Sequence, residues 1–225
     1  MRIGESWMVV QTVGSTQAEA AKLLVSGDVP DVLLAQHQTN GRGRLGRTWH
    51  SERGRSLTMS VIMREYPDHP QPWLIGMTLA IATAQVLGGQ LRWPNDVYGQ
   101  SGKLAGILSE IWPGSDGRKY VVVGVGANLR KMSWPDTVPG EAPKRAWEPQ
   151  AAGKAIIEAA RNLPEPNGWP DIESHWIALD ATPGKKYRLP TGEVVEAVAV
   201  GESGALLAKL GTRTITVLAA EGYLG

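Results

Sequence analysis

The chain has 225 residues, long enough for one large domain or for a domain with a small companion. Its 23 basic and 22 acidic side chains give a formal net charge of +1, so bulk charge does not indicate nucleic-acid binding. The absence of cysteine excludes disulfides, thiolate nucleophiles and cysteine-ligated zinc, and the four histidines share no metal-ligand spacing.

The N-terminus lacks the apolar core of a secretory signal. The longest apolar stretch, residues 73–89, contains polar residues and is too short for a membrane span. We therefore expect a soluble, cytoplasmic protein with no membrane partner.

A buried strand is expected over residues 7–13 and a helix over residues 18–25, which Gly27 ends. Ser15, Thr16 and Gln17 lie between them. Thr16, with Glu19 three residues later, resembles a capping box, which is the ordinary explanation of such residues. The alternative is a polar cluster whose hydroxyls and amide face a ligand.

A strand expected over residues 31–36 runs through Gln38 into a loop in which three glycines alternate with three arginines, at residues 41–47. Glycine permits positive φ and close approach of a ligand, and arginine matches phosphate or carboxylate. The loop alone indicates either a site for a small anion or a solvated loop that contacts nucleic acid. Either way, we expect it to be mobile when empty and ordered by an anion.

Further strands are expected over residues 56–63, 103–111 and 120–129, and a helix over residues 73–87. Between the helix and the second of these strands lies Trp-Pro-Asn-Asp at residues 93–96, followed by a turn at residues 99–102. This order places Lys103 across a turn from Asp96. Glycines at 124 and 126 inside the last strand indicate either a bulge or the close approach of another group to the backbone. Asn128 should then face the group that these glycines admit.

The remainder should contain an irregular segment at residues 132–149, helices at 151–163 and 170–179, and then short strands at 185–189, 194–200, 206–209 and 214–217. The last four indicate a small SH3-like β-barrel. Because about 44 residues bury little surface, we expect this unit to pack on the first. The expected domains are residues 1–181 and 182–225.

Four motifs, taken together, resemble the catalytic domain of biotin protein ligases. They are Ser-Thr-Gln at 15–17, the Gly/Arg loop with Trp49, Trp-Pro-Asn-Asp at 93–96, and Lys-Leu-Ala-Gly-Ile-Leu at 103–108. The resemblance covers nearly the whole chain and is closest to the monofunctional kind, without an N-terminal DNA-binding helix-turn-helix. It implies an α/β fold (α+β) related to class II aminoacyl-tRNA synthetases: a mixed sheet backed by helices, with the small β domain after it.

The resemblance also implies a reaction. Biotin and MgATP give biotinyl-5′-adenylate and pyrophosphate, and a lysine of a biotin carboxyl carrier domain then takes the biotinyl group. Family members include monomers and homodimers. Both reactants of the first step are anionic, so catalysis should come from positioning and charge neutralisation without an enzyme nucleophile.

The resemblance implies site residues as well. Lys103 is the expected catalytic cation, with Arg44 beside it. The biotin site should comprise Ser15, Thr16, Gln17, Gln38, Gly41, Arg42, Gly43, Arg44, Lys103 and Gly106. The nucleotide site should comprise Arg42, Arg44, Trp49, Asn95, Asp96 and Asn128. Asp96 should share Mg²⁺ with substrate phosphates.

The chain departs from the family pattern at three places. Arg92 replaces the usual lysine, which keeps the charge but not its compact geometry. Gln17 replaces a common asparagine and is one methylene longer. Residues 219–225 lack the family's terminal arginine, so a nucleotide contact from the small unit loses its support.

Two other functions fit the residues less well. A lipoate or octanoate ligase or transferase would share the fold and the acceptor type, but the Gly/Arg loop and Lys-Leu-Ala-Gly-Ile-Leu favour biotin. A binding module that has lost turnover would be favoured by Arg92 but not by an intact Lys103 and Asp96.

Overall fold

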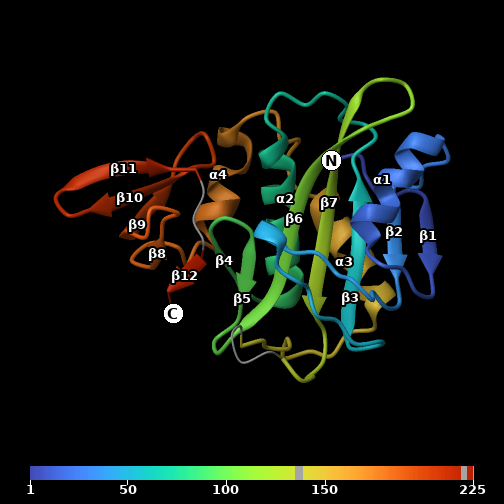
Figure 1. Cartoon of the computed structure of the whole chain (residues 1–225), viewed down its shortest axis with the longest axis horizontal. Helices are drawn as coiled ribbons and strands as arrows, with labels where there is room; N and C mark the ends of the chain where they lie inside the picture. Colours follow the sequence, from blue (N-terminus) through green and yellow to red (C-terminus); the bar gives the residue numbers. More distant parts are fainter. Residues whose placement is uncertain (135–138, 219–221, 225) are drawn as a thin grey trace.

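Two β-sheets organise the chain in a computed structural model that describes residues 1–134, 139–218 and 222–224 (Figure 1). The larger sheet has seven strands in the order β1-β2-β3-β7-β6-β5-β4. Only β1 and β2 pair in parallel; the other neighbours in this sheet are antiparallel. The smaller sheet has five strands in the order β11-β10-β9-β8-β12 and is antiparallel throughout. The expected mixed sheet with a small β unit is confirmed.

The elements of the larger unit follow in chain order. They are β1 (Trp7–Val10), α1 (Thr16–Ser26), β2 (Val32–Ala35), the 3₁₀ turn η1 (Arg44–Gly46), β3 (Ser56–Ile62), α2 (Pro72–Leu87), β4 (Gln90–Arg92), β5 (Asp96–Tyr98), β6 (Lys103–Pro113), β7 (Lys119–Asn128), α3 (Pro149–Arg161) and α4 (Trp169–Ile177). The smaller unit comprises β8 (Lys186–Arg188), β9 (Val194–Val200), β10 (Leu206–Leu210), β11 (Arg213–Val217) and β12 (Gly222–Leu224).

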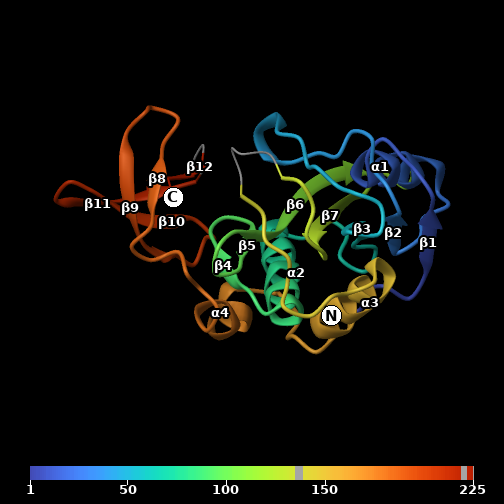
Figure 2. The same ribbon diagram turned by 90° about the horizontal axis from the view of Figure 1, so that it is seen from below.

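Helices cover the larger sheet unequally. Figure 2 shows α2, α3 and α4 on one face, whereas α1 and the loop that contains η1 lie on the other. Helix α2 is buried on most of its surface because it is apolar almost all round, and its core partners include Leu57, Ile107 and Ile156. A smaller apolar cluster, with Leu24 and Leu33, lies under α1. The face with only one helix therefore has room for a site.

The smaller sheet packs on the larger unit through Trp93. Its indole is buried among residues of the small sheet and lies edge-on to Tyr187, at 5.7 Å between ring centroids. Trp93 Nε1 donates to the carbonyl of Gly204, and the Tyr187 hydroxyl donates to the carbonyl of Trp93. The expected packing of the β unit is thus confirmed. The boundary at residues 181 and 182 stays a prediction.

Several local expectations differ from the structure. Strand β1 ends at Val10 and is only partly buried, because it is an edge strand. The capping box is wrong: Ser15 occupies the N-cap, no side chain caps the helix, and the Thr16 hydroxyl bonds elsewhere. Strand β12 was not expected. Residues 219–221 and 225 lie outside the described residues, so the family comparison at 219–225 is not tested.

The region expected to be irregular, residues 132–149, forms no helix or strand over its described residues before α3. Residues 135–138 lie outside the described part. One bridge joins Gly140 to Lys103, and the Lys103 amide donates to Pro139. This segment therefore holds the start of β6 in place.

Candidate active site

A cavity of about 1010 Å³ lies between the sheet and the loop that contains η1. It is lined from α1, from the loop, from the β4–β5 connection and from the facing strands β6 and β7. Its basic lining residues are Arg42, Arg44, Arg47, Arg92 and Lys103, and its one acidic residue among those described is Asp96. Every site residue expected from the sequence lines this cavity except Gly41, which is buried at the base of the loop.

One end of the cavity, here called the amide end, consists of Ser15, Thr16, Gln17 and Gln38. Thr16 and Gln38 satisfy each other: Gln38 Oε1 accepts from the Thr16 backbone N–H at 2.7 Å and from its hydroxyl at 3.0 Å. The Ser60 hydroxyl in turn donates to Thr16 Oγ1 at 2.8 Å. This arrangement leaves the Thr16 hydroxyl one acceptor site and Gln38 its amide hydrogens for a ligand.

Ser15 and Gln17 differ from that pair. Both are buried, yet Ser15 Oγ and Gln17 Oε1 find no hydrogen-bond partner among the described residues. A buried polar atom without a partner is costly, and the cost is removed when a ligand supplies one. The amide end therefore suits a neutral ligand that carries both hydrogen-bond donors and an acceptor.

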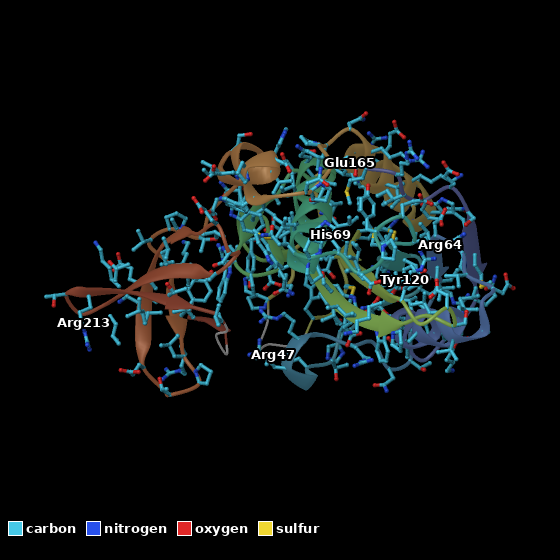
Figure 3. All side chains as sticks on the ribbon, turned by 90° about the horizontal axis from the view of Figure 1, so that it is seen from above. Arg47, Arg64, His69, Tyr120, Glu165 and Arg213 are labelled. Carbon is cyan, nitrogen blue, oxygen red and sulfur yellow. The ribbon has the colours of Figure 1, made fainter. Side chains whose placement is uncertain are left out.

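The loop over the cavity, here called the lid (residues 41–49), closes on itself. Arg42 bridges to Thr48, and the Trp49 N–H donates to the carbonyl of Gly41. Its tip is exposed at Leu45, which has a φ of 55°. Figure 3 shows Arg47 on this side of the sheet, away from Glu165 on the helical side.

The three lid glycines were expected to adopt positive φ or to admit a close approach, and they differ in which of these they do. Gly46 alone has a positive φ, 73°, whereas Gly43 is extended. At Gly41, a Cβ would lie 2.4 Å from the carbonyl oxygen of Trp49, so that position needs glycine for space. The mobility expected of the empty lid stays a prediction.

Trp49 turns back from the lid onto the sheet. A Cβ at Gly126 would lie 2.5 Å from the Trp49 indole, and one at Gly106 would lie 3.3 Å from it. These glycines face each other across β6 and β7 without a break in register, so they mark close approach and not a bulge. Trp49 Nε1 is buried without a described partner.

Lys103 and Asp96 meet beside this indole, as the sequence predicted. Lys103 Nζ lies 2.6 Å from Asp96 Oδ1, and both side chains are about one-fifth to one-quarter exposed, at 18% and 25%. The ammonium lies 5.7 Å from the Trp49 ring centroid. We call Arg44, Asn95, Asp96 and Lys103 the charged end of the cavity.

Arg44 reaches this end from the lid. Its Nη1 donates to Asn95 Oδ1 at 3.4 Å. Burial lowers the pKa of Arg44 and the charge of Arg47 adds to that effect, whereas Asp96 opposes it. A partly desolvated guanidinium of this kind gains most from an anionic ligand.

The two asparagines hold the backbone of β6. Asn95 Nδ2 donates to the carbonyl of Ile107, and Asn128 Nδ2 donates at 2.8 Å to the carbonyl of Lys103. Their predicted contact with phosphates stays a prediction. Their amide donors already position the strand that carries the catalytic lysine candidate.

The donor set fits a metal only together with a substrate. The described residues contain no cluster of three or more His, Cys, Asp or Glu side chains that could hold an ion. Asp96, the carboxylate of the cavity, is paired with Lys103. An ion such as Mg²⁺ would thus depend largely on phosphate oxygens and water, with Asp96 as its protein ligand.

Sequence reasoning missed Glu110, which bonds both the lid and Gln17. The period of a strand could have found it, because Glu110 follows Gly106 and Leu108 at alternate positions of β6, and those two residues line the cavity. It also missed Tyr187 and Trp134, which line the cavity from distant parts of the chain.

The model of the biotin/lipoate A/B protein ligase family matches residues 10–128, which include all the motifs above. The chain is 32% identical to a "Biotin--[acetyl-CoA-carboxylase] ligase" of Mycobacterium tuberculosis, over 97% of this chain and 90% of that protein. It is 34% identical to the "Bifunctional ligase/repressor BirA" of Bacillus spizizenii, over 68% of this chain and 49% of that one.

The fold is similar to that of a biotin protein ligase from Aquifex aeolicus solved in complex with biotin and ATP. The TM-score is 0.72 at 24% identity, over 96% of this chain and 97% of that chain. This likeness concerns the fold. Because the family model covers more than half of the 225 residues and the Mycobacterium relative aligns almost end to end, the chain belongs to the biotin/lipoate A/B protein ligase family.

Proposed function

We propose that the protein is an ATP-dependent ligase that activates biotin as biotinyl-5′-AMP and transfers it to a lysine of a biotin carboxyl carrier domain. The observation that carries the proposal is one cavity with two chemically different ends. The amide end has buried hydrogen-bonding atoms that find no partner in residues 1–134, 139–218 or 222–224 and could bind a neutral ring, and the charged end has the cations that a carboxylate and a phosphate need.

In the first step, a carboxylate oxygen of biotin attacks the α-phosphorus of ATP. A new oxygen–phosphorus bond forms the mixed anhydride, and the bond from the α-phosphorus to the oxygen that bridges the α- and β-phosphates breaks as pyrophosphate leaves. Two anions must approach each other, so Lys103 and Arg44 act by neutralising charge as it concentrates. Asp96 holds the Lys103 ammonium at 2.6 Å, which fixes the charge before the substrates arrive.

Mg²⁺ would enter with ATP and neutralise its phosphate oxygens, with Asp96 as the protein ligand. Trp49 supplies a flat apolar wall beside Gly106 and Gly126, which suits the nucleotide base. Arg42, Gly43 and Arg44 would cover the adenylate, so that water does not reach the mixed anhydride.

In the second step, the neutral amine of an acceptor lysine attacks the carbonyl carbon of the anhydride. An amide forms, the carbon–oxygen bond to the phosphate breaks, and AMP leaves with its electron pair. A proton is lost from the amine. The lid must admit one extended side chain and exclude bulk water during this step.

The deciding experiment is pyrophosphate release by the purified protein with MgATP and biotin, compared with lipoate and octanoate. We expect release with biotin and, after addition of a biotin carboxyl carrier domain, one labelled lysine per domain. Release with lipoate or octanoate but not with biotin would replace this function with that of the other branch of the family.

A further inference from the structure

Glu110 contacts both the lid and the amide end, which lie in separate segments of the sequence. It lies on β6, two residues beyond Leu108 on the same face of the sheet. Its Oε1 accepts from Arg42 Nη2 of the lid at 3.0 Å, and its Oε2 accepts from Gln17 Nε2 of the amide end at 3.2 Å. One carboxylate therefore contacts the lid and the amide end at once.

The hydrogen bonds of Gln17 determine which way its amide points. Nε2 lies within hydrogen-bond distance of Glu110 Oε2, the Leu108 carbonyl at 3.1 Å and the Val122 carbonyl at 3.3 Å. All three are acceptors, so the oxygen of the amide cannot occupy that position without repulsion. Oε1 is accordingly the atom of this amide that has no partner within the part of the chain that the structure describes.

The backbone of β6 and β7 beneath the Gln17 amide leaves space for it and places its three acceptors. A Cβ at Gly124 would lie 3.1 Å from Gln17 Cδ, so the amide lies flat over a glycine. Gly124 pairs with Leu108, and Val122 pairs with Glu110, which places the three acceptors side by side across β6 and β7. The side chain is 3% exposed and has little freedom to turn.

The ion pair with Arg42 is of a different kind. The Arg42 side chain is 42% exposed and that of Glu110 22% exposed, so the pair is only partly screened. Arg42 also forms the base of the lid through its bridge with Thr48. Breaking the ion pair should therefore free the lid without unfolding the sheet.

We propose that Glu110 is a positioning residue that couples the lid to the biotin ring site. With one oxygen it holds the lid down through Arg42, and with the other it keeps Gln17 Oε1 turned to the cavity as an acceptor for a ring N–H. The ligand class that fits is a cyclic urea or amide with an N–H donor. This proposal rests on the proposed function for its ligand, but not for its effect on the lid.

The test compares Glu110→Gln with the unaltered protein, because glutamine keeps the size and loses the charge. Cleavage by trypsin after Arg44 and Arg47 of the ligand-free protein should become about tenfold faster, since local opening governs it. The KM for biotin should rise about tenfold while kcat changes less than about twofold, because uniform binding is lost.

Arg42→Gln should have the same two effects, and the double variant Arg42→Gln/Glu110→Gln should be no worse than the stronger single one. Glu158→Gln is the matched control: Glu158 forms an exposed ion pair with Arg161 on α3, and both readings should stay at the level of the unaltered protein. Unchanged cleavage in Glu110→Gln, additive effects in the double variant, or a loss confined to kcat would each overturn the proposal. If the unaltered protein neither binds nor turns over biotin, the proposed function fails, and the cleavage rates still decide the role of Glu110 at the lid.

Discussion

The polar groups at the two ends of the cavity differ in whether they are already paired. At the amide end, Thr16 and Gln38 bond to each other, while Ser15 Oγ and Gln17 Oε1 are buried without a partner among the described residues. At the charged end, Lys103 and Asp96 are already paired at 2.6 Å. If the proposed function holds, recognition of the ring would depend on hydrogen bonds that the ligand completes. Activation would instead depend on charged groups that are already paired before the ligand binds.

The largest effect should come from the charged end. Lys103→Ala should lower the rate of pyrophosphate release by more than about 1,000-fold, because it removes the cation that we propose neutralises the reacting carboxylate and phosphate. The melting temperature should change little, since the ion pair is partly exposed. Lys154→Ala, on the exposed side of α3, is the control. Near-normal turnover in Lys103→Ala would remove this residue from its role.

Arg44→Gly should have the next largest effect, on retention and not on formation of the adenylate. Loss of the lid cation should speed release of the intermediate by about 10- to 100-fold, as expected for a charge-assisted contact. Surface lysines of bystander proteins should then be labelled, which blotting detects. Arg213→Gly, at the far end of the small sheet in Figure 3, should label only the carrier domain. Equal release rates for the two variants would contradict a covering role for Arg44.

Substitutions at two glycines on β7 should each affect one end of the cavity, and therefore the KM of a different substrate. Gly126→Ala would force the Trp49 indole away, since the new Cβ would lie 2.5 Å from it, and should raise the KM for ATP about tenfold. In Gly124→Ala, the new Cβ would lie 3.1 Å from Gln17 Cδ, and the KM for biotin should rise by about threefold. Initial rates at varied ATP and biotin measure both. Gly201→Ala, which makes only ordinary contacts, is the control, and a reversed pattern would show that the two ends are wrongly assigned.

The smallest effects are expected at the amide end, where one substitution should change mainly the affinity for biotin and another mainly the stability of the fold. Ser15→Ala removes a hydroxyl that makes no cap bond and no other hydrogen bond to a described residue, so stability should hold or rise while the KM for biotin rises about fivefold. Thr16→Val breaks bonds with Gln38 and Ser60 and should cost about 1–3 kcal/mol of unfolding free energy. Urea denaturation and biotin titration give both values. Equal destabilisation by the two changes would remove the distinction drawn between these neighbours.

The helices and strands of the larger unit followed from patterns within short segments. Alternation and apolar runs predicted β3, β7 and α2 closely, because these elements bury continuous apolar surface, and they predicted β6, which is buried mainly over its first half. Edge strand β1 was placed too long and too deep, since an edge has only one neighbour to specify its length. The capping box failed because Gln38, distant in sequence, takes the Thr16 hydroxyl that a cap would use.

Three local motifs that the sequence singled out do line one cavity: the Gly/Arg loop, Lys103 opposite Asp96, and the polar cluster at residues 15–17. Their residue types indicated an anion site and a polar site, and the family resemblance joined them into one site. Among the described residues, no helix has the length and apolar character needed to cross a membrane. The tertiary structure alone decided which polar atoms remain free and that Glu110 bonds the lid to Gln17. Hydrogen-bond partnership depends on distances between strands far apart in the chain, and no local pattern contains those distances.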